Sequence, residues 1–350
     1  MSKQAINYNL SKDDTLLIKG IAICFMLWHH LFYENLEYGM AVFQIAQLGK
    51  VCVSLFIFLS FYGLTIQYQK VQNNAFVDTI KFVAKRLTKF YINYWVIFLI
   101  FVPLGVFVFG RELGEAYGEG RGLKMFFTDF LGINGFKSYN ITWWFNQLII
   151  YLYLLFPLLY FVVKKWKWVS LFIGVVVWFV NFPILLWEAH AWLLHAMFGI
   201  AVAQNIDKIS ITLNKINKWL LSGIVIVLFF ALFFVRNSAI IPYFTGIRVD
   251  AFLAIAITLF AIIFIRNVKY ISYLFTFLGK HSINIFMVHT FIYHYWFKNF
   301  IYSFENPFII FFVLLFICTM ISVLLEFIKK QVKLPVFTKK ITFKIDKITL

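Results

Sequence analysis

The sequence predicts an all-α, polytopic membrane protein, a single bundle of about ten transmembrane helices with both termini in the cytoplasm. Of its 350 residues, 62% are hydrophobic and only 13% are charged, whereas soluble domains are nearer half apolar and a quarter charged. Apolar segments long enough to cross a bilayer recur along the whole length, and no long polar segment separates them. We therefore expect one integral-membrane domain over residues 1–350.

The apolar segments are assigned as spans by length and hydropathy, because a helix surrounded by lipid shows little amphipathic periodicity. The predicted spans cover residues 15–35, 48–68, 88–109, 143–163, 168–187, 190–205, 218–235, 248–265, 282–301 and 307–328. The polar N-terminus, residues 1–14, shows no small-residue cleavage site, so we expect the first span to be retained.

The basic residues set the predicted orientation. Of the 32 Lys and Arg residues, 23 fall on the side of the termini, eight fall on the other side, and Lys19 lies inside the first span. Positive charge gathers in cytoplasmic loops, so residues 1–14 and the basic tail 329–350 are predicted to be cytoplasmic. The net charge of +17 would favour nucleic acid in a soluble protein. Because these charges lie in short loops, we expect a lipid bilayer and no nucleic acid as partner.

The first span carries two ionisable residues, Lys19 and His30, which are costly inside a bilayer and usually mark a pathway or a reaction. On a helix these two residues lie on nearly the same face, with His30 about 16 Å further along the axis than Lys19. His30 either takes a proton from a hydroxyl as a general base or packs across two helices. His29, rotated by about 100°, is a partner or a packing residue. Lys19 either snorkels to the inner surface or fixes a phosphate or a carboxylate.

A basic cluster, Lys81, Lys85, Arg86 and Lys89, lies at the predicted inner start of the third span. It either reflects only the bias of positive charge towards the cytoplasm or binds a polyphosphate ligand. In the second case Arg86 offers a planar fork and the lysines offer point charges.

Five further residues are candidates for substrate binding. Trp144 belongs to an aromatic belt at the outer interface or stacks on a sugar ring, and Asn146 indicates an inward polar face. Arg248 and Asp250 open the eighth span as a local salt bridge or as a substrate clamp. His289, in the ninth span, is either structural or functional.

The predicted outward loop, residues 110–142, is long, Gly-rich and of mixed charge, and it is either a lid or acceptor-binding element or a tether. Cys24, Cys52 and Cys318 lie in or at the ends of spans without metal or redox spacing, and we interpret them as small apolar fillers. The sequence contains no zinc spacing, phosphate loop or nucleophile elbow. We therefore expect no metal, and covalent catalysis has no obvious nucleophile.

Short segments spread along the chain resemble, in their sequence order, the motifs of acyltransferase family 3 of multi-pass membrane proteins. Lys19 to His30 resembles the family's basic residue followed, after ten positions, by histidine. Residues 55–63 are similar to its Phe-Phe-x-Leu-Ser-Gly signature, 85–89 to its paired-arginine motif, 144–157 to its Trp-to-Pro stretch, and 278–289 to its late Leu-Gly-x-x-Ser to His element. The chain departs from the family pattern at four positions: Lys19 and Lys89 stand where arginine is commoner, Phe61 replaces a glycine, and Ile149 replaces a frequent carboxylate.

The resemblance implies a cell-membrane enzyme that moves an acyl group, usually acetyl, from cytoplasmic acetyl-CoA to a hydroxyl of an extracytoplasmic or lipid-linked sugar or polysaccharide. In that case His30 would be the base with Lys19 and His29 beside it, and Lys85, Arg86 and Lys89 would bind the donor's phosphates. Two rivals stay open: a transporter or flippase for a lipid-linked sugar with proton-coupling histidines, and an acyltransferase acting on an amine or a small metabolite. The sequence sets neither the acceptor nor the acyl length, and it is compatible with an oligomer.

Overall fold

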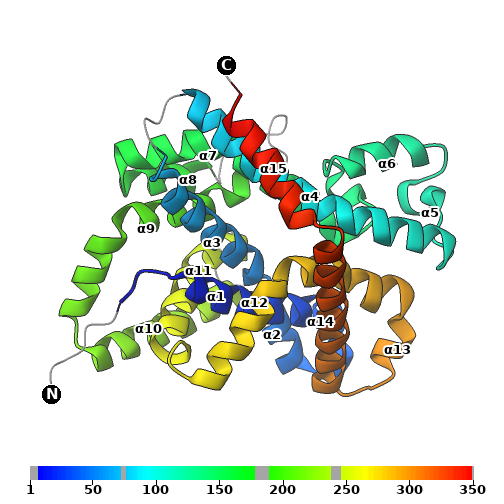
Figure 1. Ribbon diagram of the computed structural model, residues 1–350. Helices are drawn as coiled ribbons and strands as arrows, with labels where there is room; N and C mark the ends of the chain where they lie inside the picture. The colour runs from blue at the N-terminus through cyan, green and yellow to red at the C-terminus, as the bar shows by residue number, and fades with distance from the viewer. Residues whose placement is uncertain (1–6, 72–75, 178–188, 238–245, 349–350) are drawn as a thin grey trace. The chain divides into compact units, whose positions relative to one another are not determined.

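The computed structural model describes residues 7–71, 76–177, 189–237 and 246–348, and within these ranges the regular structure is helical, with no β-strand (Figure 1). The predicted all-α class is therefore confirmed. In the same ranges seven helices are long and apolar enough to cross a membrane. They are Lys12–Phe32, Met40–Tyr68, Phe76–Phe107, Ile141–Trp166, Lys218–Asn237, Ile247–Ile265 and Pro307–Gln331.

Three of the ten predicted spans have no counterpart among these seven. The span 168–187 begins as α8 (Val169–Val177), and its remainder lies outside the described residues. The span 190–205 lies within α9 (Ala189–Lys215), whose second half is polar. The span 282–301 is divided among α12 (Lys269–Thr290), the π-helix η5 (Phe291–Trp296) and α13 (Lys298–Tyr302). The count of ten and the cytoplasmic placement of both termini stay predictions.

By internal contacts the chain forms two compact units. Unit 1 comprises Met1–Lys70, Leu158–Pro183 and His190–Ser282, and unit 2 comprises Val71–Pro157, Ile184–Ala189 and Ile283–Leu350. The unit boundaries fall inside α7 (Trp144–Trp166) and α12. Because both units contain candidate spans, this division does not separate a soluble domain from a membrane part.

Unit 1 is built around α1 (Lys12–Phe32). The helix begins with a capping box: Ser11 Oγ accepts from the amide of Asp14 at 3.0 Å, and the Asp14 carboxylate accepts from the amide of Ser11 at 2.9 Å. The other elements of unit 1 are η1 (Leu36–Tyr38), α2 (Met40–Gly49), α3 (Val51–Tyr68), the last part of α7, α8, α9, α10 (Lys218–Asn237), α11 (Ile247–Phe260), the π-helix η4 (Ala261–Ile265) and the first part of α12. Helix α1 packs on α2 and α3, and α11 packs on α3 and α10.

Two glycines of the family-like segments let α1 and α12 approach backbone to backbone. A Cβ atom on Gly20 would overlap the carbonyl oxygen of Phe275, and one on Gly279 would overlap the carbonyl oxygen of Leu16. Close helix contacts in membranes use small residues in this way, because little else allows backbones to approach. These motif positions therefore set the packing of the helix that carries Lys19 and the two histidines.

Unit 2 contains α4 (Phe76–Phe107), the first part of α7, the end of α12, η5, α13, α14 (Pro307–Gln331) and α15 (Leu334–Asp346). The predicted third span began at residue 88, but α4 begins twelve residues earlier, so the basic cluster lies within a helix rather than before one. Residues 110–142 form the short elements α5 (Leu113–Tyr117), α6 (Gly122–Phe130), η2 (Gly135–Lys137) and η3 (Ile141–Trp143).

A buried lysine ties three helices of unit 2 together. Lys329 of α14 is 4% exposed, and its Nζ donates to Asn93 Oδ1 at 3.1 Å, Asn284 Oδ1 at 2.8 Å and Glu326 Oε1 at 2.8 Å. An ammonium group has three donors, so this charge is fully hydrogen-bonded despite its burial. The network explains a lysine inside a packed helix without assigning it to a ligand.

Candidate functional site

The last turn of α1 places His29 and His30 side by side in unit 1. Their ring centroids lie 5.2 Å apart in an edge-to-face arrangement, and both side chains are half-buried. Nδ1 of His29 lies 2.7 Å from the carbonyl oxygen of Ala46 on α2. Since a carbonyl can only accept, Nδ1 carries a proton and Nε2 of the neutral ring keeps its lone pair. The bond to Ala46 therefore fixes both the orientation and the tautomer of His29.

A glycine on α2 makes this contact with α1 feasible. A Cβ atom on Gly49 would overlap the carbonyl oxygen of Phe25 and lie 2.8 Å from Cβ of His29. Any larger residue at this position would push α2 away and break the bond between Ala46 and His29. Helix α2 was not predicted, because the second span was expected to begin at residue 48.

A buried ion pair joins the helices α10 and α11. Arg236, in the last turn of α10, donates from Nε to Asp250 Oδ1 at 2.5 Å and from Nη2 to Asp250 Oδ2 at 3.2 Å. The two side chains are 6% and 0% exposed. An acid in the first turn of a helix and a base in the last turn are both favoured by the helix dipole. Of the two interpretations of Arg248 and Asp250, the local salt bridge is corrected: residues two apart on a helix do not face each other, and Asp250 pairs with Arg236. The substrate clamp stays a prediction.

The ion pair and the histidines belong to one electrostatic neighbourhood. The charges of Lys50 and Arg236 both act on the imidazole of His29. Helix α2, which ends next to Lys50, contacts both α1 and α10. We call the group His29, His30, Lys50, Arg236 and Asp250 the histidine site. Arg236 and Lys50 were missed because each was counted only as an outer-side charge. The signal was that each lies at the predicted outer end of a span, the side also predicted for His30 and Asp250.

Lys19 lies on the same helix as the histidine site but about 16 Å away along its axis. Its side chain is half-buried. The neighbouring Gly20 packs against the backbone of Phe275, so Lys19 lies next to a tightly packed helix contact of unit 1. Arg248 lies in the first turn of α11, as Asp250 does, and its side chain is also half-buried.

The predicted inner basic cluster is divided between two faces of α4 in unit 2. Lys85 donates to Asp346 Oδ1 of α15 at 2.6 Å, and Lys81 donates to the carbonyl oxygen of Asp346 at 3.0 Å. Arg86 points to α7, where its Nη2 donates to the hydroxyl of Tyr153 at 2.5 Å and its guanidinium lies 4.7 Å from the centre of that ring. Lys89 is exposed. Arg86 is thus the member of the cluster that a hydrogen bond and a ring contact hold in place.

Asn146 of α7 is a buried amide that the surrounding protein leaves unsatisfied. Its side chain is fully buried, and neither its nitrogen nor its oxygen has a hydrogen-bond partner among the described residues. Burying such groups without a partner costs about 1–3 kcal/mol. Nearby Trp144 is half-buried and its ring lies 5.3 Å from that of Phe136, so it packs on the predicted outward loop.

His289 lies in a buried chain of hydrogen bonds in unit 2. Its Nδ1 lies 2.7 Å from the carbonyl oxygen of Phe286, and its Nε2 lies 3.3 Å from Thr290 Oγ1. Thr290 Oγ1 is 2.9 Å from Thr142 Oγ1, which donates to Asn140 Oδ1 at 2.7 Å. The chain joins the end of α12 to the segment that precedes α7, which gives His289 a structural role whatever else it does.

The loop 110–142 is held by one buried acid, Asp129. Its Oδ2 accepts from the amide of Tyr139 at 2.6 Å and from the hydroxyl of Tyr117 at 2.7 Å, while its carbonyl oxygen accepts from Tyr94 at 2.5 Å. Desolvation outweighs these hydrogen bonds and raises the pKa of Asp129 to about 6. The loop is therefore a folded element rather than a bare tether.

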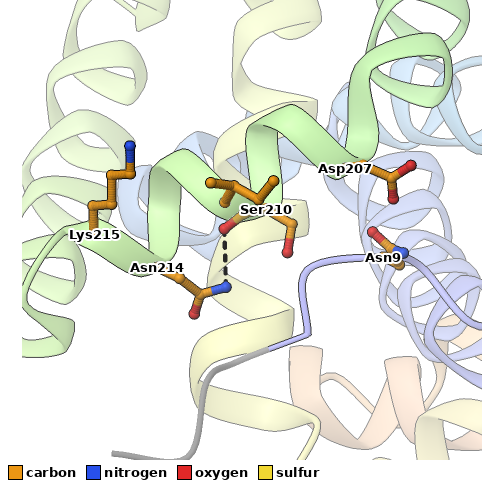
Figure 2. A pocket seen from close by; sticks show the side chains of 6 residues that line it. Asn9, Asp207, Ser210, Asn214 and Lys215 are labelled. Carbon is orange, nitrogen blue, oxygen red and sulfur yellow. Dashed lines mark hydrogen bonds between the residues drawn. The ribbon is translucent and has the colours of Figure 1, made fainter.

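A polar groove of about 500 Å³ lies elsewhere in unit 1, at the opposite end of α1 from the histidines (Figure 2). It is lined by Asn9 from the segment before α1 and by residues of α9: Asp207, Ser210, Ile211, Asn214 and Lys215. The side-chain amide of Asn214 donates to the carbonyl oxygen of Ser210 at 2.9 Å. About 28 Å of helix separates Ser11 from His30, so this groove is not part of the histidine site.

Seven candidate spans, and two half-buried histidines near a buried ion pair, indicate a polytopic membrane protein with a polar site among the helices of unit 1. The family model of the acyltransferase domain matches residues 16–327, nearly the whole chain. The chain belongs to acyltransferase family 3, as the resemblance predicted, and is a membrane acyltransferase. No curated protein and no solved structure matches it significantly.

Proposed function

We propose that this chain is an O-acetyltransferase of the plasma membrane that moves an acetyl group from cytoplasmic acetyl-CoA to a hydroxyl of an extracytoplasmic or lipid-linked sugar or polysaccharide. The observation that carries the proposal is the histidine site, in which His29, oriented by Ala46, and its ring neighbour His30 lie near a buried ion pair in a membrane acyltransferase. Such a site suits proton transfer away from bulk water.

In the proposed reaction His30 removes the proton from the acceptor hydroxyl as the hydroxyl oxygen attacks the thioester carbonyl carbon. The new C–O ester bond forms and the C–S bond breaks, with the electron pair leaving on sulfur. The CoA thiolate then takes the proton from the imidazolium, so the products are the acetyl ester and free CoA. His29, held by Ala46, supports His30 at ring contact distance.

The donor is proposed to bind through Lys85, Arg86 and Lys89, with Lys19 towards the thioester arm. Arg86 is the best supported of these, because Tyr153 already holds its guanidinium, whose planar donors match phosphate oxygens. To bind a phosphate, Lys85 would have to leave Asp346. Breaking that ion pair costs little free energy, because both of its groups are partly exposed.

The acceptor is proposed to contact Trp144, Asn146, Arg248, Asp250 and His289. Asn146 supports this most directly, because an amide with unused donors and acceptors can bind a sugar hydroxyl. Asp250 is already bonded to Arg236, and His289 to its hydrogen-bond chain, so these two have the least free hydrogen-bonding capacity to offer an acceptor.

The test is transfer by the purified protein supplied with radiolabelled acetyl-CoA, followed both as free CoA and as label in carbohydrate from the membrane. We expect His30→Ala to abolish transfer and His29→Ala to lower it strongly. The matched control is His281→Ala, which replaces another half-buried histidine, on α12. This variant should transfer normally. Transfer by His30→Ala at the wild-type rate would overturn the base assignment, and absence of any CoA release by the active wild type would overturn the donor.

A further inference from the structure

Helix α15 follows almost directly on α14, a candidate membrane span. Only Val332 and Lys333 separate the two helices, and Lys333 turns the chain in a left-handed conformation with φ 54°. Two residues span at most about 7 Å. Since α14 is a candidate membrane span that ends at Gln331, α15 must begin where that span leaves the hydrocarbon.

One face of α15 is used for packing within unit 2. Its half-buried residues are Leu334, Thr338, Ile341, Thr342 and Ile345, which recur at helix spacing. The helix lies along α4, as Figure 1 also shows. Its single acid, Asp346, is drawn to Lys85 and Lys81 of α4. The orientation of α15 is therefore set by contacts on one side only.

The remaining surface of α15 combines cations with large apolar groups. Lys339, Lys340, Lys344 and Lys347 are exposed. Among them lie Val336, Phe337 and Phe343, which are 54%, 54% and 58% exposed. Aromatic and aliphatic groups beside lysines suit the headgroup layer of a bilayer, where the rings reach the acyl boundary and the ammonium groups reach phosphates.

We propose that α15 is an interfacial helix that binds anionic phospholipid headgroups of the bilayer in which α14 is embedded. Each lysine near such a surface is attracted by the negative potential of the anionic lipids. With Asp346 held by α4, the outward face presents positive charge alone. The lysines are spread over about 12 Å of helix, from residue 339 to 347, which fits a surface of headgroups rather than one compact anion. Binding there would also hold the basic start of α4 against the membrane.

The test is hydrogen exchange of the α15 amides in the full-length protein, reconstituted in nanodiscs of phosphatidylcholine alone or with added phosphatidylglycerol. Anionic lipid should slow exchange in α15 several-fold, and high salt should reverse the effect. A variant with Lys339, Lys340, Lys344 and Lys347 all replaced by Gln should exchange at the same rate in both lipids.

The matched control replaces four other exposed lysines of the predicted inner side, Lys164, Lys165, Lys208 and Lys218, with Gln. It loses the same total charge and should keep the full response to lipid. Equal exchange in both lipids for the wild type, or equal loss of the response in both variants, would overturn the proposal. Inorganic phosphate or CoA added to phosphatidylcholine nanodiscs should not protect α15; protection by either would assign these lysines to a soluble anion instead.

Discussion

Arg236 and Asp250 are joined by two hydrogen bonds inside unit 1, with Nε to Oδ1 at 2.5 Å and Nη2 to Oδ2 at 3.2 Å. Both side chains are buried. A buried pair of this kind gains little net stability over apolar residues, but breaking it leaves one charge uncompensated. The pair therefore makes the packing of α10 on α11 sensitive to loss of either partner.

We expect Asp250→Asn to destabilise the protein by about 3 kcal/mol, because it leaves the Arg236 charge buried without a counter-ion. The double variant Arg236→Met with Asp250→Leu should recover most of that stability while losing transfer. Thermal unfolding in detergent measures the first effect and acetyl transfer the second. Arg121→Gln, an exposed arginine of the loop 110–142, serves as the control. An unchanged melting temperature for Asp250→Asn would contradict the buried-pair argument.

Gly20→Ala and Gly279→Ala should each strongly lower the melting temperature, since either methyl group would overlap a backbone carbonyl of the facing helix. Backbone atoms cannot move aside as a flexible side chain can, so α1 and α12 would have to separate. Gly223→Ala provides the comparison: it lies within α10 with open space around it, and alanine is favoured over glycine in helices by about 1 kcal/mol. Loss of stability in all three variants alike would remove the packing explanation.

The helical class and the family could be predicted from sequence, because span length, hydropathy and the order of short motifs are local properties. The pairing of Asp250 could not, since its partner lies on another helix and Arg248 was nearer in sequence. Helix α2 was missed because its residues lie between two strongly apolar segments and carry no start signal of their own. The π-helix η5 interrupted the ninth predicted span for a similar reason: hydropathy detects apolar side chains but not a change in backbone hydrogen bonding.

Arg86→Ala should raise the KM for acetyl-CoA about 10- to 100-fold, the loss expected for a charge-assisted hydrogen bond to phosphate. Arg86→Lys should recover only part of this, because lysine keeps the charge but not the planar fork. Steady-state kinetics with the purified protein give the answer. Lys208→Ala, an exposed cation of the same predicted side, should leave KM unchanged. If Arg86→Ala behaves like that control, the basic cluster reflects only membrane topology.

The loop 110–142 should be more stable in acid. The pKa of Asp129 is raised from 3.8 to about 6 in the folded protein, chiefly by desolvation. Folding therefore favours the protonated acid: its stabilising effect is complete below pH 4 and is lost as the pH rises to 6. The change is at most about 3 kcal/mol. Hydrogen exchange of residues 122–139 between pH 4 and 7 measures it. Asp129→Asn should abolish the pH response specific to this loop, and an identical response in that variant would show that other groups cause it.

Asn146 and its neighbour Gln147 should respond oppositely to replacement by leucine. Asn146→Leu removes a fully buried amide that has no partner among the described residues, so we expect the protein to gain about 1–3 kcal/mol in stability. Gln147 donates to the hydroxyl of Tyr151 at 2.9 Å, so Gln147→Leu should lower stability instead.

If Asn146 is kept for the acceptor, its leucine variant should melt at a higher temperature yet transfer less acetyl, while still showing a normal KM for acetyl-CoA. A gain in stability that comes at the expense of activity is typical of a binding residue, since a packing residue would lose both together. Full transfer by Asn146→Leu would therefore remove this residue from the acceptor site.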